Sequence, residues 1–458
     1  MTGDIFRLFS PGARLAIILF AMMGQIRNLS VLSVGSLTAR PIPARPAGPG
    51  PSQSTVMRSL QVNAAAFKGM GRLAFVCGGL LYILDGQAGR VRQLTKEGVS
   101  SQPAWSHDGE WLAFMHEATP KAMSAVWLAR FDGTQLRQVS NTDLGYRFSW
   151  SPAKNVLAVD GKNGLLLVPV NGVRRRLREG GLSWAPDGGS LAYSFTLPFD
   201  FNHPEGRTDA LRTITVEGGQ PVNRLTAPGG NGIVLAGWWP NGKGLLYWLD
   251  PDHSASLMAD GVDLYSLRLG ASEPELLASG LDRRGWLSTS SGNRLVMVKG
   301  GPRIVWANKS LALINLESGN VQDLENLAGC VTIDPSLSPD GSQIALVAAR
   351  DLGDHVWGFN RTEDLTSWVA TRTLWVENSD GSGAHPLTAA GRGIYQPQWS
   401  KNGKRILYVK DNSLWLIGID GGEPEEICGP LSYEDPTTGP FGYYGFVSYL
   451  DEMAWYRH

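Results

Sequence analysis

Histidine side chains are the first candidates for chemistry in this sequence, because imidazole binds transition metals and transfers protons near neutral pH. The seven His residues are spread along 458 residues, and no HExxH pair, Walker loop or GxSxG elbow accompanies them. We therefore expect no catalytic residue, no bound metal and no cofactor. The alternative is a polysaccharide lyase or hydrolase whose metal is bound by His203, His253 and His355, which fall in three separate polar insertions.

Aromatic and arginine side chains gather in the same insertions, and these residue types anchor many protein interfaces. Trp357 and Trp368 lie outside any repeated motif, so we predict that they contact a protein or peptide partner or stack on a sugar ring. The alternative is that they pack within their own loop. The insertion residues that we predict to bind a partner are Phe201, His203, Arg207, His253, His355, Trp357, Arg361 and Trp368.

A second group of candidates stands where repeated units of the sequence begin. Arg283 and Arg284 are adjacent, and a pair of guanidinium groups is suited to a carboxylate or a phosphate. If the first strand of each unit lines a channel, these side chains point toward its mouth. The alternative is that they are solvated or form local ion pairs. The group comprises Arg147, Arg283, Arg284 and Tyr395.

An internal repeat predicts the elements that must position these residues. Each copy contains an aromatic or apolar residue, a turn of the Ser-Pro-Asp-Gly type and a short apolar strand. A second strand pair, joined by a glycine turn, follows every copy between residues 62 and 427. The copies at Phe67 and Ser288 depart most from the pattern. The copies begin at Phe67, Trp105, Trp150, Trp184, Trp238, Ser288, Leu337 and Trp399.

The residues of the repeat indicate four antiparallel strands per unit. Pro fixes φ in the turn, Asp binds nearby backbone and Gly adopts positive φ. One four-stranded sheet cannot bury both of its faces, whereas sheets stacked radially cover one another and a closed ring protects their edges. We therefore predict an all-β fold, a β-propeller of eight four-stranded blades, with seven blades as the alternative. The Trp residues predicted to fill the space between sheets are Trp105, Trp150, Trp184 and Trp399.

These repeats resemble the WD40-like repeats of TolB-type β-propellers, which also occur in the propeller domains of prolyl-oligopeptidase-family peptidases. The resemblance covers residues 62–427 and rests on turn and packing residues, so it implies a fold and not a function. No segment resembling an α/β-hydrolase domain follows the repeats. The resemblance therefore does not lead us to expect peptidase activity.

The amino-terminal region differs from the repeats. Arg7 and Arg14 precede a short apolar stretch over 15–23, which is typical of a signal peptide or a membrane anchor within residues 1–39. A Pro-rich linker over 40–56 then leads to the propeller, which we place at 57–458. We expect the protein to be exported, and so periplasmic, extracellular or anchored to a membrane and facing outward.

The carboxyl-terminal tail over 443–457 is strand-like, and we predict that it closes the ring. Met453–Tyr456 aligns with the second strand of a truncated repeat. We expect the tail to pair with the segment around Met57–Val62. The sequence leaves open whether the tail replaces a strand of the first blade or adds to it.

Strand direction alternates, so all long insertions are expected on one face of the ring. The net charge of −1 argues against a nucleic-acid partner. We predict a non-catalytic scaffold that binds a protein or peptide of the cell envelope through this face, with a membrane tether as an option and an undefined oligomeric state. The further alternative is a carbohydrate or small-ligand module. The insertions span 115–124, 195–210, 250–262, 299–309 and 349–371.

Overall fold

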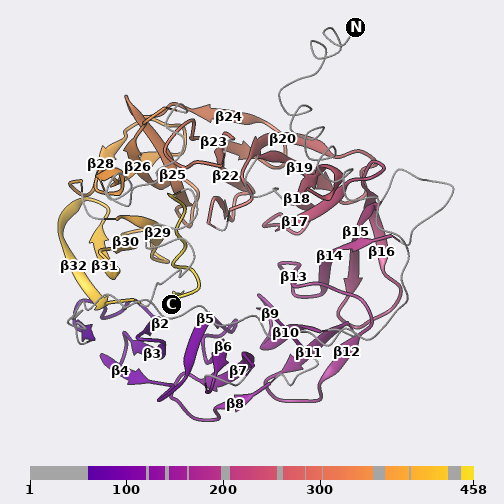
Figure 1. Ribbon diagram of the computed structural model, residues 1–458, viewed down its shortest axis with the longest axis horizontal. Helices are drawn as coiled ribbons and strands as arrows, with labels where there is room; N and C mark the ends of the chain where they lie inside the picture. The colour runs from indigo at the N-terminus through magenta and orange to yellow at the C-terminus, as the bar shows by residue number, and fades with distance from the viewer. Residues whose placement is uncertain are drawn as a thin grey trace, which may run out of the picture. The chain divides into compact units, whose positions relative to one another are not determined.

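One compact unit spans Arg58–His458 in this computed structural model. The described residues form eight antiparallel sheets, arranged as blades around a common axis (Figure 1). The chain is therefore an all-β, eight-bladed β-propeller, as predicted, and the seven-bladed alternative is wrong. The structure describes residues 60–119, 123–139, 144–161, 164–197, 207–254, 261–283, 285–301, 303–353, 367–390, 393–431 and 445–457.

The first four blades occupy the amino-terminal half of the ring, and their strands are given from the inner edge outward. Blade 1 contains β33 (Met453–Tyr456), β2 (Arg72–Cys77), β3 (Leu80–Asp85) and β4 (Arg90–Gln93). Blade 2 contains β5 (Val99–Trp105), β6 (Trp111–Glu117), β7 (Ala125–Arg130) and β8 (Arg137–Gln138). Blade 3 contains β9 (Leu144–Trp150), β10 (Val156–Gly161), β11 (Leu165–Pro169) and β12 (Arg175–Leu177). Blade 4 contains β13 (Ser183–Trp184), β14 (Ser190–Thr196), β15 (Asp209–Thr215) and β16 (Val222–Thr226).

The other four blades complete the ring in the same strand order. Blade 5 contains β17 (Gly232–Trp238), β18 (Gly244–Asp250), β19 (Val262–Arg268) and β20 (Glu275–Gly280), with a short 3-10 turn, η3 (Pro251–His253), after β18. Blade 6 contains β21 (Leu287–Ser290), β22 (Arg294–Lys299), β23 (Ser310–Asn315) and β24 (Val321–Leu324). Blade 7 contains β25 (Cys330–Leu337), β26 (Gln343–Arg350), β27 (Thr373–Asn378) and β28 (His385–Pro386). Blade 8 contains β29 (Tyr395–Trp399), β30 (Arg405–Lys410), β31 (Ser413–Gly418), β32 (Gly421–Gly429) and β1 (Gln61–Val62).

Tryptophans on the inner strands join each of several blades to the preceding one. The indole N–H of Trp150 on β9 donates to the backbone carbonyl of Ala104 on β5 over 2.9 Å. A Trp side chain buries about 150–250 Å², so each of these residues combines packing with a directed hydrogen bond. The structural role predicted for the repeated Trp residues is confirmed. Equivalent bonds to the preceding inner strand come from Trp105, Trp184, Trp238 and Trp399.

The turn between first and second strands is built by the side chains that the repeat conserves along the chain. In blade 2, the Ser106 hydroxyl donates to Asp108 over 2.7 Å and accepts the N–H of Trp111 over 3.0 Å. Asp108 also accepts the N–H of Glu110. Gly109 has a φ of 68°, where a side chain would be strained. These local bonds explain why the turn recurs with the same residue types.

All five predicted insertions lie between the second and third strands of their blades. The strands alternate in direction, so these links share one end of the blades with the links from one blade to the next. We name this end the long-link face, and the opposite end, which carries the tight turns, the short-turn face. The links run from β6 to β7, β14 to β15, β18 to β19, β22 to β23 and β26 to β27.

Two strand pairings between the ends of the chain and other blades close the ring, and both differ from the predicted pairing. β33 pairs with β2 and becomes the inner strand of blade 1, so the alignment of Met453–Tyr456 with a second strand is wrong. β1 pairs instead with β32, with Gln61 opposite Gly429. The predicted pairing of the tail with the segment around Met57–Val62 is therefore wrong as well. The tail does take part in closure, because blade 1 lacks an inner strand until β33 supplies it.

Apolar side chains are buried between successive blades and form several clusters. Cluster members come from facing sheets, as in blades 2 and 3, where Trp111 packs with Leu157. Among the described residues, no helix is long and apolar enough to cross a bilayer.

Candidate functional site

A cavity of about 640 Å³ lies against the inner strands of blades 3, 4 and 5. It is lined by parts of β9, β10, β14 and β17 and by the link that leads into β13. Asp160 stands near the end of β10, and Gly180 and Gly181 belong to the link between blades 3 and 4. These residues belong to the long-link end of the blades. The cavity therefore lies in the channel wall toward the long-link face.

Arg147 is the predicted site residue that the structure places at this cavity. It lies on β9, and its side chain is exposed. No described residue forms an ion pair or a hydrogen bond with its guanidinium group. Asp160 supplies a carboxylate to the same cavity, and one of its oxygens accepts the N–H of Gly161 over 2.9 Å. The cavity thus offers an exposed cation, a carboxylate and polar backbone.

Tyr193 lines the cavity together with Ala192 and Ser194 of β14. Its hydroxyl donates to Glu179 over 2.9 Å, and Arg212 binds the same carboxylate oxygen over 3.0 Å. Burial and the Glu179 carboxylate raise the pKa of Tyr193, so the phenol stays neutral and acts as a donor. This network fixes Tyr193, while the exposed Arg147 side chain makes no such contact with a described residue.

The links of blades 4 and 5 contact each other beside this cavity. The ring Nε2 of His253 lies 2.8 Å from the backbone carbonyl of Arg207. The Arg207 guanidinium donates to Thr196 Oγ1 over 3.0 Å and is exposed. Thr196 in turn donates to Asp209 over 2.7 Å. The structure thus brings together two predicted residues, Arg207 and His253, at the long-link face.

Arg283, Trp368 and Tyr395 lie elsewhere, and all three are buried. The Arg283 guanidinium lies 4.9 Å from the ring centre of Phe446, so it faces the tail and not an open channel mouth. The Trp368 indole donates to the carbonyl of Arg350 over 2.8 Å, and its ring contacts that of Trp306. These positions favour the packing alternative for Trp368, and they place Arg283 and Tyr395 beneath residues of the tail.

A buried polar cluster holds the tail against blades 6, 7 and 8. Arg372 lies between the rings of Trp368 and Tyr395, with ring centres at 4.6 and 4.3 Å, and donates to the carbonyl of Gly445. Asp334 accepts the indole N–H of Trp286 over 3.1 Å. Burial raises the pKa of Asp334, and the nearby Arg372 charge opposes that shift. This cluster covers the inner ends of three blades.

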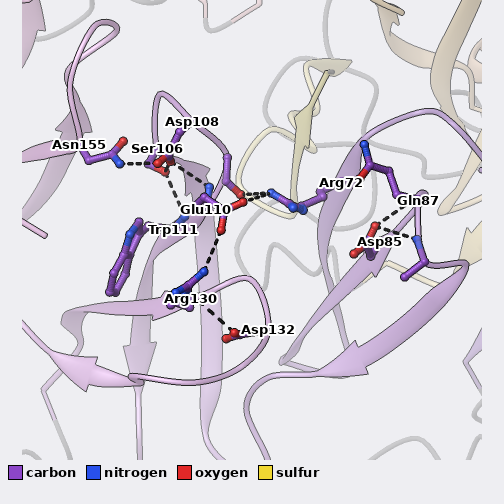
Figure 2. Close-up of polar contacts among 12 residues, drawn as sticks. Arg72, Asp85, Gln87, Ser106, Asp108, Glu110, Trp111, Arg130, Asp132 and Asn155 are labelled. Carbon is purple, nitrogen blue, oxygen red and sulfur yellow. Dashed lines mark hydrogen bonds and ion pairs between the residues drawn. The ribbon is translucent and has the colours of Figure 1, made fainter.

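At the short-turn face, ion pairs and hydrogen bonds connect neighbouring blades. Figure 2 shows Glu110 between Arg72 of blade 1 and Arg130 of its own blade, at 3.1 and 2.9 Å. Arg72 also donates to the carbonyl of Gly109 in the next blade's turn over 2.7 Å. Arg294 makes the corresponding bond to Gly341 between blades 6 and 7. These contacts join residues of the ring to one another at the short-turn face.

Six predicted site residues lie outside the described part of the chain. The three-His hypothesis falls largely there, since His253 alone of its members is described. Within the described ranges, no group of three or more His, Cys, Asp and Glu side chains is arranged to hold a metal ion. The six residues are Phe201, His203, Arg284, His355, Trp357 and Arg361.

Most of the cavity was not predicted, because backbone and small side chains line it. The sequence does carry one signal, the Gly180-Gly181 pair that stands just before Trp184. A Cβ on Gly181 would lie 2.5 Å from the Cβ of Tyr193, so this position requires Gly. A paired glycine ahead of a repeat Trp therefore marks a close approach of backbone to the inner edge of blade 4.

The fold and cavity define the chain as an eight-bladed β-propeller with a cavity at the inner strands of blades 3, 4 and 5. No family model matches the sequence. The uncharacterized peptidase YuxL of Bacillus subtilis (strain 168) is 24% identical over 115 residues. That match covers 24% of this chain and 16% of the length of YuxL.

Solved structures resemble the chain at low sequence identity. A eukaryotic initiation factor is 15% identical with a TM-score of 0.52, and the match covers 82% of this chain and 89% of that chain. TolB from Acinetobacter baumannii is 14% identical, with a TM-score of 0.35 and coverages of 79% and 64%. A prolyl endopeptidase is 14% identical, with a TM-score of 0.44 and coverages of 80% and 51%. The likeness to the initiation factor, at 15% identity, shows the fold alone.

Proposed function

We propose that this propeller is a non-catalytic scaffold that binds a protein or peptide through its long-link face. The observation that carries the proposal is the cavity of about 640 Å³ in the wall of blades 3, 4 and 5. This volume falls within the roughly 300–1,000 Å³ typical of ligand sites. The links that contain Arg207 and His253 stand at the same end of blades 4 and 5.

The rigidity of the ring supports a binding role. Loops on a rigid scaffold are frequent binding sites, and a preformed site lowers the entropic cost of association. Arg147 at the cavity and Arg207 beside it are both exposed cations. A partner that presents carboxylates or backbone carbonyls would match them.

We also propose that the chain acts outside the cytoplasm, with its amino-terminal region serving as a signal peptide or a membrane anchor. The basic flank and short apolar stretch within residues 1–39 support export. The proline-rich stretch over 40–56 would then act as the tether between that region and the ring. An envelope protein is accordingly the class of partner that we expect.

Site-specific photo-crosslinking in intact cells tests the binding face. A photoreactive amino acid replaces Arg207 or Asp252 at the long-link ends of blades 4 and 5. Matched controls replace Asp187 or Lys243, which are exposed in the short turns of the same blades. We expect one protein to be trapped from Arg207 and Asp252 and not from the controls. Equal trapping from both faces, or none from either, would contradict the proposal.

A further inference from the structure

Blade 4 has the shortest inner strand of the ring. β13 contains two residues and pairs only with Leu191 and Ala192 of β14. β14 itself continues to Thr196 and is paired with β15 along its whole length on the other side. The inner strands of blades 2, 3 and 5 each contain seven residues. The inner edge of β14 is therefore open over its last part.

The open edge presents backbone hydrogen-bonding groups to the cavity. In an antiparallel sheet, alternate residues direct both their N–H and their C=O to the same neighbour. The carbonyl of Ser190 accepts the N–H of Ala185 at the inner edge, so Ser194 and Thr196 also direct their backbone groups inward. No described residue forms a backbone hydrogen bond with those inward groups. Ser194 is exposed and lines the cavity.

Glycine explains how the chain leaves this edge uncovered. Gly181 approaches Tyr193 and Ala192 so closely that a Cβ would clash with both. Beyond this contact the chain reaches β13 at Ser183, and no residue of β13 is paired with Ser194 or Thr196. An unpaired strand edge is a template for pairing with another extended chain.

We propose that an extended acidic peptide segment of a partner protein binds in this cavity by pairing with β14 at Ser194 and Thr196. The inference rests on the proposed function and names its binding mode. Charge selects the occupant, since the exposed Arg147 lies at the cavity and the exposed Arg207 is bound to Thr196 Oγ1 at the end of the same strand. A carboxylate side chain of the peptide would face Arg147, while its backbone completes the ladder.

Selection of random eight-residue peptides on the full-length chain tests this inference. The enriched peptides should be rich in Asp and Glu. Each is then synthesised with N-methyl groups on alternate residues, in the two possible registers. A paired strand uses the N–H groups of one register only, so methylation of that register should weaken binding about tenfold or more, and methylation of the other by less than about threefold.

Charge variants supply the matched controls. Arg147→Glu should weaken binding of the acidic peptides about tenfold, whereas Lys243→Glu on the short-turn face should leave it unchanged. Asp160→Asn removes the one carboxylate at the cavity and should strengthen binding. Failure to enrich any peptide, equal effects of the two methylation registers, or indifference to Arg147→Glu would each overturn strand pairing.

The two proposals fail in different ways. A partner that crosslinks at Arg207 and Asp252, yet is neither displaced by the selected peptides nor weakened by Arg147→Glu, would overturn strand pairing and leave the binding face in place. Peptides that pair with β14 while no partner crosslinks to the long-link face would support strand pairing and contradict the proposed function.

Discussion

Single indole groups connect the blades of this ring. Trp150 is buried, and its N–H donates to Ala104 of the preceding blade. The acceptor is a backbone carbonyl, so loss of the donor leaves a polar group without its partner. Such a loss costs about 1–3 kcal/mol when the group is buried. The repeat thus encodes an inter-blade bond and not only a space-filling ring.

Replacing Trp150 with Phe keeps an aromatic ring and removes the donor. We expect the free energy of unfolding to fall by about 1–3 kcal/mol, measured from the midpoint of urea denaturation. Trp127→Phe is the matched control, because Trp127 is half-buried and its indole N–H bonds to no described residue. An equal loss in the two variants would show that the hydrogen bond contributes nothing beyond packing.

Glu452 precedes the closing strand, and one of its carboxylate oxygens is buried with no hydrogen bond to any described residue. Burial, aided by the Asp451 charge, raises the pKa of Glu452 from its ordinary 4.5 to about 8. In this range the folded state holds a proton that the unfolded state has lost. Stability should therefore fall as pH rises from about 4.5 to about 8.

Glu452→Gln tests this dependence, because the amide resembles the protonated acid and does not titrate. We expect the variant to match the parent near pH 4.5 and to exceed it in denaturation midpoint at pH 8. The difference between the two proteins isolates Glu452 from all other titrating groups. A difference that is constant across this pH range would refute the assignment.

The sequence predicted the positions and roles of some residues better than those of others. The repeat Trp residues were predicted correctly, because their role follows from local spacing. Arg147 was predicted to face the channel and lies at the cavity. Arg283 and Tyr395 were predicted in the same way and are buried, because the tail residues Phe446 and Tyr449 pack on them. That contact joins segments distant in sequence, which spacing alone does not reveal.

At the scale of elements, two short strands close the ring, and their side chains differ in how deeply they are buried. β33 places Trp455 and Met453 in the core, and the Trp455 indole donates to the carbonyl of Met70 over 2.6 Å. β1 adds two residues at the outer edge of blade 8, with Val62 half-buried. β33 should therefore contribute most of the closure energy.

Matched truncations of the two strands measure this difference. Trp455→Ala should lower the free energy of unfolding by about 3–5 kcal/mol, as buried Trp truncations do. Val62→Ala should lower it by about 1 kcal/mol. Urea denaturation of the full-length chain compares the two. A larger loss from Val62→Ala would mean that β1, and not β33, holds the ring closed.

Blade number was predictable because the turn and strand pattern recurs in every unit and most copies begin at a Trp. The pairing of the ends was not, because a four-residue strand such as β33 fits any inner-edge position by pattern alone. The short β13 could have been suspected from Gly180 and Gly181, which interrupt the run ahead of Trp184. The short β13 leaves part of the inner edge of β14 unpaired. This result depends on the register of the two strands, which is known only from the assembled sheet.

At the scale of the whole molecule, the inner wall of the ring is asymmetric. The tail and the Arg372 cluster cover the inner ends of blades 6, 7 and 8. Blades 3, 4 and 5, on the right of the ring in Figure 1, line the cavity instead. The covered inner ends follow from the way the tail closes the ring, and the cavity follows from the short inner strand of blade 4. The fold therefore determines where the cavity lies.

We expect a partner to bind at the cavity of blades 3, 4 and 5, toward the long-link face. Hydrogen exchange of the full-length chain, alone and with the crosslinked partner or a selected peptide, tests it most directly. We predict slower exchange over 180–197 and 228–236 and no change in the short turns at 106–110, 240–243 and 400–404. Slower exchange confined to the short turns or to the outer strands would contradict the account.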